Sequence, residues 1–183
     1  MVAQIQVVVP PSAVRPGETG WVATTVRIDV VLPGTAGAEA ARAVQRAVLR
    51  PHGPLPTDRE PERDWLLLAA VDQTGETIGA ASLCPDDWPR TDLLVLTAPQ
   101  WQLRGVSVIQ ASRGTGVGSA LVDASIAAAR THGAASLWAE ARIRALPLYQ
   151  RTGWHVVGDE WNKPGVGPHR YIWTALSRHD GGR

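Results

Sequence analysis

Residues 111–121 read ASRGTGVGSAL, with glycines at alternate positions 114, 116 and 118 between an arginine and a predicted helix. A strand that stops at such a turn and restarts as a helix presents several backbone N–H groups and the positive end of the helix dipole to one point. Glycine permits positive φ angles and lets a ligand approach the backbone closely. The segment therefore predicts an anion site, and phosphate is the anion that such loops usually bind.

Three interpretations of this loop can be compared residue by residue. A P-loop would need Gly-Lys-Ser/Thr at its end, but Gly118 is followed by Ser119 and Ala120, so this class is excluded. A dinucleotide fingerprint would need a sixth-position glycine counted from Gly114, where the chain has Ser119, although Glu140 stands near the expected acidic position. The dinucleotide interpretation therefore stays open, as does a connector without a ligand.

The composition limits the class of protein. The chain has 183 residues, 44% of them hydrophobic, and 18 basic against 17 acidic side chains give a formal net charge of +1. This balance predicts one globular domain that binds neither nucleic acid nor a membrane surface, so any anion site must be local. Apolar runs such as WLLLAAV at 65–71 are far shorter than the ~18 residues that a membrane-spanning helix needs.

The single cysteine and the N-terminal segment bear on location. Cys84 excludes an intramolecular disulfide, and we interpret it as a small core residue rather than a nucleophile. The first basic residue is Arg15, and no long apolar core precedes a cleavage-like site, so no secretory signal is expected. We therefore expect a cytoplasmic protein.

The order of elements predicts a mixed sheet flanked by helices. Residues 1–20 are interpreted as an extension, 21–177 as a single domain and 178–183 as a flexible tail. Helices are expected over 36–49, 116–131 and 145–153, and in the second of these Val117, Leu121, Ala124 and Ala128 share one stripe. Strands are expected over 21–33, 64–72, 77–84, 101–108, 134–141, 154–161 and 169–176, with Gly75 in the turn between the second and third of these.

Two of these segments carry further expectations. In the helix over 36–49, Ala40, Val44 and Val48 have the spacing of one buried face, with Ala41 and Ala47 beside them. Residues 50–64 contain four prolines and many charges, so we expect a loop that lies across a binding cleft.

The chain contains eight tryptophans and no phenylalanine. Tryptophan could simply take the core positions that phenylalanine usually occupies. Alternatively, some of these rings line an aromatic pocket that holds an ammonium group by cation–π attraction. The candidates for that pocket are Trp65, Trp88, Trp101, Trp138, Trp161 and Trp173.

Four segments together match one known family. Residues 113–118 fit the pattern R/Q-x-x-G-x-G/A, and ARIRALPLYQRTGW at 141–154 fits A-x-x-x-Y-x-x-x-G-F/W. LRGVSVIQASRG at 103–114 and GVGPHRYIW at 165–173 extend the match. The chain thereby resembles the GNAT superfamily of N-acetyltransferases over about residues 22–176.

This resemblance implies an α/β (α+β) fold and an activity. The fold would have a mixed, mostly antiparallel central sheet of about six to seven strands, flanked by helices and splayed between the fourth and fifth strands. The activity would be transfer of the acetyl group of acetyl-CoA to a primary amine by direct attack in a ternary complex, with no metal.

The resemblance also implies which residues bind the coenzyme. Val106 and Val108 would pair through their backbones with the pantetheine arm, and the Val106 amide would stabilise the oxyanion. Arg142 stands where many relatives have a coenzyme-binding asparagine, and we expect it to contact the coenzyme too. The pyrophosphate would be bound by backbone amides of Arg113, Gly114, Thr115, Gly116, Val117, Gly118 and Ser119, with the Arg113 side chain adding charge.

For catalysis, Tyr149 falls where the family places its general acid, and it would protonate the departing thiolate and contact the coenzyme. Some relatives have a glutamate base on the fourth strand, but this chain has Gln102 there, which cannot act as a base. Glu140 and His169 are the remaining candidates. A solvated carboxylate and a structural histidine are the respective alternatives.

The acceptor cannot be identified from the sequence. A small-molecule amine and a peptide or protein amine are both compatible, and so is a homodimer. A non-catalytic acyl-CoA sensor or partner-binding module on the same fold is the alternative function, and a nicotinamide-dependent oxidoreductase is a third.

Overall fold

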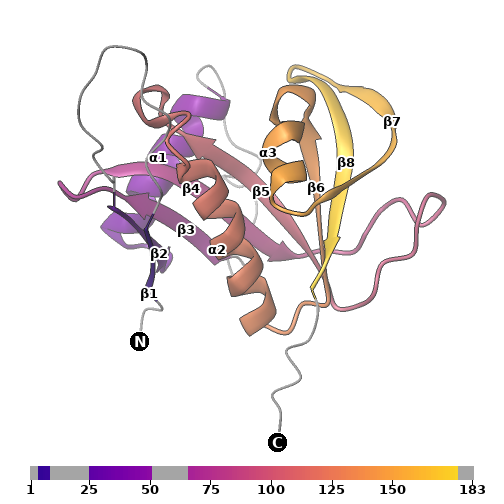
Figure 1. Ribbon diagram of the computed structural model, residues 1–183, viewed down its shortest axis with the longest axis horizontal. Helices are drawn as coiled ribbons and strands as arrows, with labels where there is room; N and C mark the ends of the chain where they lie inside the picture. Colours follow the sequence, from indigo (N-terminus) through magenta and orange to yellow (C-terminus); the bar gives the residue numbers. More distant parts are fainter. Residues whose placement is uncertain (1–3, 9–24, 51–65, 177–183) are drawn as a thin grey trace, which may run out of the picture. The chain divides into compact units, whose positions relative to one another are not determined.

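The computed structural model describes residues 4–8, 25–50 and 66–176. The predicted cleft loop falls outside this range apart from Arg50, as do Trp65, the predicted tail and most of the predicted extension. The described helices are α1 (Ala36–Leu49), α2 (Val117–Thr131) and α3 (Leu146–Arg151), with the short 3-10 helices η3 (Gln110–Ser112) and η4 (Ile143–Ala145) (Figure 1). The strands are β1 (Gln4–Val8), β2 (Thr25–Val31), β3 (Leu66–Val71), β4 (Thr77–Pro85), β5 (Gln100–Val108), β6 (Ser136–Arg142), β7 (His155–Lys163) and β8 (Gly167–Ala175).

The strands form one sheet in the order β1-β2-β3-β4-β5-β6-β8-β7. The pairs β1–β2, β2–β3, β6–β8 and β7–β8 are antiparallel, whereas β5 and β6 are parallel. The expected mixed, mostly antiparallel sheet is therefore confirmed. The described sheet has eight strands rather than six to seven, because β1, within the predicted extension, pairs with β2.

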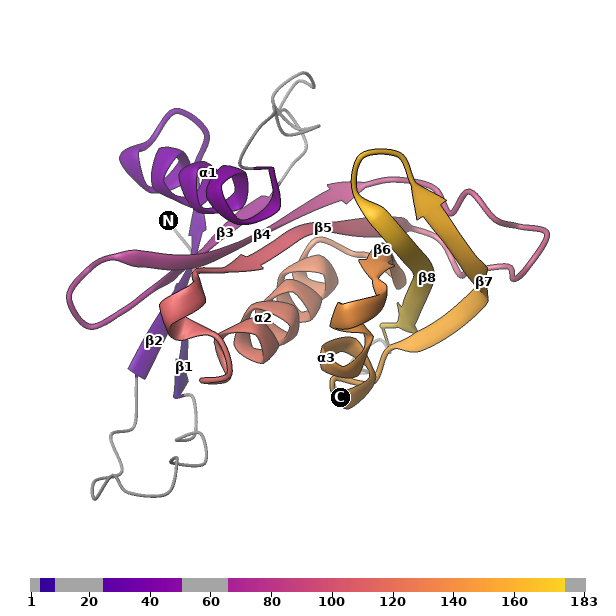
Figure 2. The ribbon, with the colours of Figure 1, turned by 90° about the horizontal axis from the view of Figure 1, so that it is seen from above.

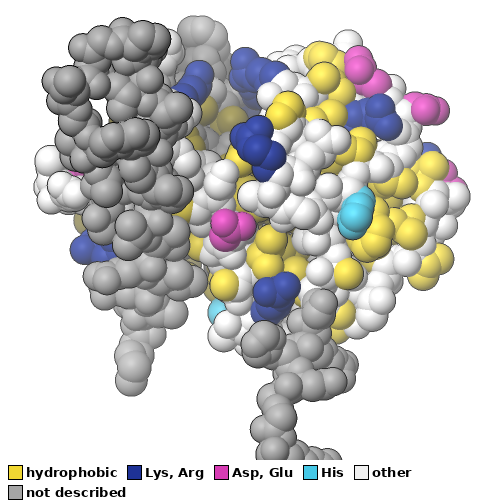
Figure 3. Space-filling view, in the orientation of Figure 1, with side chains coloured by type: hydrophobic (Ala, Val, Ile, Leu, Met, Phe, Trp, Pro, Cys, Tyr) yellow, Lys and Arg dark blue, Asp and Glu magenta, His cyan; other side chains and the backbone are white. Residues whose placement is uncertain are grey.

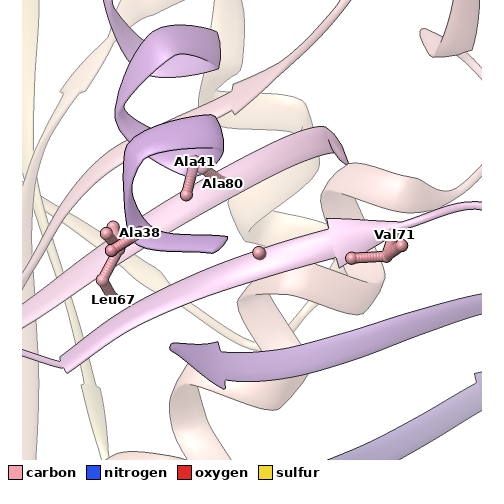
Figure 4. Close-up of a cluster of buried hydrophobic side chains, with 6 residues drawn as sticks. Ala38, Ala41, Leu67, Val71 and Ala80 are labelled. Carbon is pink, nitrogen blue, oxygen red and sulfur yellow. The ribbon is translucent and has the colours of Figure 1, made fainter. Parts of the chain in front are cut away.

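The chain divides into two compact units, one of residues 1–82 and 105–124 and the other of residues 83–104 and 125–183. In the first unit, α1 and the first half of α2 lie on opposite sides of the strands (Figure 2). Small side chains let α1 approach β3 and β4 closely (Figure 4). The cluster at this contact comprises Ala38, Ala41, Leu67, Ala69, Val71 and Ala80.

The first half of α2 packs on the other side of β4. A Cβ added to Gly79 would lie 3.0 Å from Leu121 Cδ1 and 3.3 Å from Val117 Cγ1. The predicted stripe of α2 is confirmed, since Val117 and Leu121 are buried together with Ala124. Glycine at 79 is therefore what allows the helix to sit this close to the strand.

Helix α1 has the predicted bounds, but its buried face differs from the predicted one. Thr35 caps the helix, its hydroxyl accepting from the Ala38 amide at 3.3 Å. Of the predicted face, Ala41 and Val44 are buried, Ala40 and Val48 are half-buried, and Ala47 is exposed. The buried residues of the helix are Ala38, Ala41, Arg42, Val44 and Gln45. The prediction was thus right for Ala41 and Val44, and it missed Arg42 and Gln45 because an apolar pattern assigns polar side chains to the outside.

In the second unit, β5 and β6 pair in parallel only over Gln100–Gln102 and Ser136–Trp138. Both strands continue beyond this short ladder, which is the expected splay. A core cluster of this unit is rich in aromatic residues, with Trp88 and Trp138 edge to face at 5.7 Å between ring centroids. Both rings are buried, as are Trp101 and Trp154, so core packing accounts for four of the eight tryptophans.

No helix among the described residues is long and apolar enough to span a membrane. Cys84 is buried at the end of β4, in agreement with its interpretation as a core residue. On the face seen in Figure 3, basic and acidic side chains are interspersed among apolar ones. On this face an anion site therefore depends on local donors rather than on a broad basic surface.

Candidate functional site

In the first unit, β5 departs from extended geometry at Gly105, whose φ is +63°. This left-handed conformation is accessible to glycine and costly for other residues. The next residue, Val106, is half-buried, whereas Ser107 is buried and its hydroxyl donates to the Ala80 carbonyl at 3.4 Å. The strand is therefore reoriented immediately before the peptide that carries the Val106 amide.

The predicted phosphate loop follows β5 through η3. Gly114 has a φ of +78° and Gly116 a φ of +93°, so two of the three alternating glycines use the conformation for which glycine is suited. The Thr115 hydroxyl donates to the Ser112 carbonyl at 2.8 Å and closes the turn. The loop is thus an ordered turn closed by a hydrogen bond, rather than an irregular connection between β5 and α2.

Helix α2 starts directly after this turn, as predicted. The Ala120 amide donates to the Gly116 carbonyl at 3.0 Å, which makes Gly116 the first residue to accept a helical bond. Helix geometry leaves the N–H groups of Val117, Gly118 and Ser119 without a partner inside this described helix. These three amides, with the positive end of a 15-residue helix behind them, present hydrogen-bond donors that suit an anion.

Arg113 differs from the sequence expectation in one respect. Its backbone amide donates to the Gln110 carbonyl at 3.2 Å, so this N–H closes η3 and is already engaged. Its side chain is exposed, and Nε donates to the Val108 carbonyl at 3.2 Å. The guanidinium therefore lies at the end of β5, where it adds positive charge beside the loop.

In the second unit, Tyr149 lies on α3 and is buried. Its ring packs edge-on against Trp154 with centroids 5.5 Å apart, and its carbonyl accepts from the Trp154 amide at 3.0 Å. Burial raises the pKa of the Tyr149 phenol above its ordinary value. The hydroxyl therefore stays protonated at neutral pH, which is the form that a proton donor needs.

The two candidate bases lie on neighbouring strands of this unit. Glu140 on β6 accepts a hydrogen bond from the Lys163 ammonium of β7, forming a partly exposed ion pair. His169 on β8 is buried, and its Nδ1 lies 2.7 Å from the Gly167 carbonyl. Because a carbonyl only accepts, Nδ1 carries the proton and Nε2 the lone pair of the neutral ring.

The environment of His169 keeps this ring neutral. Burial lowers its pKa below the ordinary value, and the charges of Lys163 and Arg142 act in the same direction. The hydrogen bond to Gly167 and the charge of Glu140 raise the pKa, but they do not offset the lowering by burial and by the two positive charges. The ring also packs against Trp161 at 5.5 Å between centroids.

Two other positions complete the description of this unit. The side-chain oxygen Oε1 of Gln102 accepts from the Arg104 guanidinium, which also donates to Asp86 at 3.1 Å, so this buried side-chain amide is a structural link. Arg142, at the end of β6, is directly opposite His169 in the β6–β8 register. Its predicted contact with the coenzyme stays a prediction.

The structure thus groups the predicted residues in two sets. Within the first unit the loop follows the strand that holds Val106 and Val108, and within the second Glu140 and His169 belong to adjacent strands. Sequence reasoning missed Gln45 and Lys163. Gln45 could have been found as a polar residue within a helical stripe, whereas nothing in the sequence links Lys163 to Glu140. Among the described residues, no three His, Cys, Asp or Glu side chains gather as metal ligands would.

Comparison with known proteins agrees with this arrangement. The chain is 25% identical over 144 residues to the uncharacterized N-acetyltransferase YitI of Bacillus subtilis, covering 78% of this chain and 94% of that one. Its fold is similar to that of an aminoglycoside 6'-N-acetyltransferase complexed with coenzyme A, with a TM-score of 0.63, 13% identity and coverage of 82% and 97%.

The ribosomal-protein-S18-alanine N-acetyltransferase of Escherichia coli is similar in fold as well, with a TM-score of 0.61, 18% identity and coverage of 86% and 98%. The model of the acetyltransferase (GNAT) family matches residues 39–154, which include the glycine loop and Tyr149. The chain therefore belongs to the acetyltransferase (GNAT) family.

Proposed function

We propose that this protein is an acetyl-CoA-dependent N-acetyltransferase that transfers the acetyl group to a primary amine by direct attack. The observation that carries the proposal is the turn at Gly114 and Gly116, which leads directly into the N-terminus of α2. The chain that contains this turn belongs to the acetyltransferase family. The turn presents backbone amides and a helix dipole to an anion, as the pyrophosphate of a coenzyme requires.

In this proposal the amides of Val117, Gly118 and Ser119 bind the pyrophosphate, and the Arg113 guanidinium adds charge. Thr115 orders the turn through its hydroxyl. The amide groups of β5 serve the rest of the coenzyme. Val108 pairs with the pantetheine arm through its N–H, because its carbonyl accepts from Arg113.

The Val106 amide donates to the thioester oxygen of the acetyl group. As the amine attacks the carbonyl carbon, this oxygen gains negative charge and the hydrogen bond strengthens. The tetrahedral intermediate then collapses, the C–S bond breaks, and the thiolate of coenzyme A leaves. As the amide forms, its nitrogen gives up to solvent the extra proton that it carries after attack, and the donor of the thiolate's proton is afterwards reprotonated from solvent.

Tyr149 supplies the proton that the departing thiolate takes up. A buried phenol with a raised pKa is fully protonated before the reaction, and transfer to sulfur occurs only as negative charge develops there. The edge-on contact with Trp154 restricts the ring, which limits the directions in which the hydroxyl can point.

The attacking amine must be uncharged, so a base has to remove a proton from the substrate ammonium. We favour His169, acting through a water, because its ring is neutral and its Nε2 carries the lone pair. Glu140 is less suited, since the Lys163 ammonium already engages its carboxylate. Glu140 then serves to hold Lys163 in place on β7.

The acceptor is left to experiment. The two solved relatives, by their descriptions, act on an aminoglycoside and on a protein alanine, so this fold serves both small-molecule and protein amines. The cytoplasmic location and the homodimer stay predictions.

The test is an acceptor screen with detection of free thiol. Wild-type protein is incubated with acetyl-CoA and a panel of polyamines, aminoglycosides, amino acids and peptides with free N-termini. Thiol release that requires both the protein and one class of amine supports the proposal. Coenzyme binding without turnover on any amine would contradict it and favour the sensor.

A further inference from the structure

Gln45 is the most deeply buried polar side chain of α1, with 1% of its surface exposed. Its Nε2 donates to the Gly105 carbonyl at 3.0 Å and to the Ser82 hydroxyl at 2.9 Å, so both amide hydrogens are engaged. All three residues belong to the first unit. The contact with Gly105 connects positions 60 residues apart and joins α1 to the backbone of β5.

The Gly105 carbonyl is one half of the peptide group that links Gly105 to Val106. The cis bond found within the described residues is Ala98–Pro99, so the Gly105–Val106 peptide is trans. A trans peptide is planar, and its C=O and N–H point in opposite directions. A donor that fixes the Gly105 oxygen therefore also fixes the direction of the Val106 N–H.

Glycine at 105 leaves this peptide more conformational freedom than a residue with a Cβ would. Gly105 has a φ of +63°, and glycine populates positive and negative φ almost equally. A Cβ at this position would overlap the Gln45 amide nitrogen. Gly105 and Gln45 are thus a matched pair, in which glycine leaves room for the amide and the amide removes the freedom that glycine introduces.

The chemistry of Gln45 points to the same role. Its Oε1 is buried and has no hydrogen-bond partner in the part of the chain that the structure describes. A buried acceptor without a partner is unfavourable, and an apolar side chain of similar volume would avoid this loss. Compared with such an apolar side chain, the Gln45 amide adds two donated hydrogen bonds, one to the Ser82 hydroxyl and one to the backbone of β5.

We propose that Gln45 is a positioning residue that holds the Gly105–Val106 peptide so that the Val106 N–H is directed at the thioester oxygen. The inference rests on the proposed function, in which Val106 is the oxyanion donor. Gln45 itself touches neither coenzyme nor acceptor. It acts on the rate through the orientation of one backbone amide.

The test compares Gln45→Met with Ser82→Ala. The first substitution keeps the volume and removes the donor, whereas the second removes the other partner of Nε2 and leaves the contact with Gly105 intact. Removal of a whole oxyanion donor lowers kcat by about 10²–10³-fold, so loss of its orientation is expected to lower kcat by about 10-fold or more. The KM values for acetyl-CoA and amine should stay within about 2-fold, and Ser82→Ala should keep its kcat within about 2-fold of wild type.

All rates are referred to the folded fraction measured by circular dichroism, so a general loss of stability does not imitate the effect. If Gln45→Met does not fold, Gln45→Leu takes its place, since its side chain is apolar and carries no hydrogen-bond donor. A second readout is the ¹⁵N–¹H resonance of Val106 during titration with a ketone analogue of acetyl-CoA. The resonance should shift in wild type and shift less in the Gln45 variant.

Three results would overturn the inference: a Gln45 variant with the kcat of wild type, a change confined to KM, or an equal loss in Ser82→Ala. A wild-type protein that shows no turnover at all would instead count against the proposed function. The two failures are therefore distinguishable.

Discussion

Replacing Tyr149 by phenylalanine isolates the proton that the proposed mechanism gives to the leaving thiolate. The substitution removes one hydroxyl and keeps the ring that packs against Trp154 at 5.5 Å. Because the volume and the apolar contacts hardly change, the free energy of unfolding should fall by less than about 1.5 kcal/mol. Any large effect on turnover then comes from the lost proton donor and not from the fold.

General acid catalysis contributes about 10²–10⁴-fold, so kcat should fall by at least ~100-fold, or about 2.7 kcal/mol in activation free energy. Affinity for acetyl-CoA should stay within about 2-fold, because the pyrophosphate loop is unchanged. The assay is thiol release at saturating acetyl-CoA and acceptor, with coenzyme affinity measured separately by calorimetry.

The chain offers a matched control, since Tyr171 is its only other tyrosine. Tyr171→Phe makes the same chemical change within the aromatic cluster around Trp88, and it should leave kcat within about 2-fold. Equal turnover of Tyr149→Phe and wild type would refute the assignment of the acid. Equal losses in both variants would show that the assay reports packing rather than proton transfer.

Three further outcomes are expected. Gly79→Val should lower the free energy of unfolding by about 1–3 kcal/mol in urea titrations, because a Cβ at this position already lies 3.0 Å from Leu121. An unchanged urea midpoint of unfolding would contradict the close packing of α2 on β4. Glu140→Gln should cost at most about 1 kcal/mol, since its ion pair with Lys163 is partly exposed, and should lower kcat/KM less than His169→Gln does. Burial lowers the pKa of His169 in the folded protein, so just below the usual histidine pKa the unfolded chain binds more protons than the folded protein does. The free energy of unfolding should therefore decline as pH falls from about 7.5 to about 5.5. His169→Gln should reduce that decline.

The elements around the loop could be predicted because their signals are local. Alternating glycines, the stripe that starts at Val117 and the glycine turns each depend on neighbours within a few residues, and the structure has α2 and Gly75 where the pattern indicated. Helix α1 has its predicted bounds for the same reason.

The features that could not be predicted from the sequence depend on residues that are distant in the chain. Gln45 is buried because the Gly105 carbonyl, 60 residues away, accepts its hydrogen bond, and an apolar pattern assigns such a residue to the surface. Similarly, Glu140 could be named as a candidate base, but its value as a base depends on Lys163 on another strand. Strand β1 was missed because a short run among prolines shows no periodicity of its own.

The central claim is that the loop between β5 and α2 binds the pyrophosphate of acetyl-CoA. Titration calorimetry of the wild-type protein with acetyl-CoA tests it most directly, with NAD as the competing ligand and Gly118→Asp as the variant that places a negative charge among the amides. We expect saturable binding of acetyl-CoA, no binding of NAD and loss of affinity in Gly118→Asp. Absence of binding at millimolar acetyl-CoA, or unchanged affinity in the variant, would contradict it.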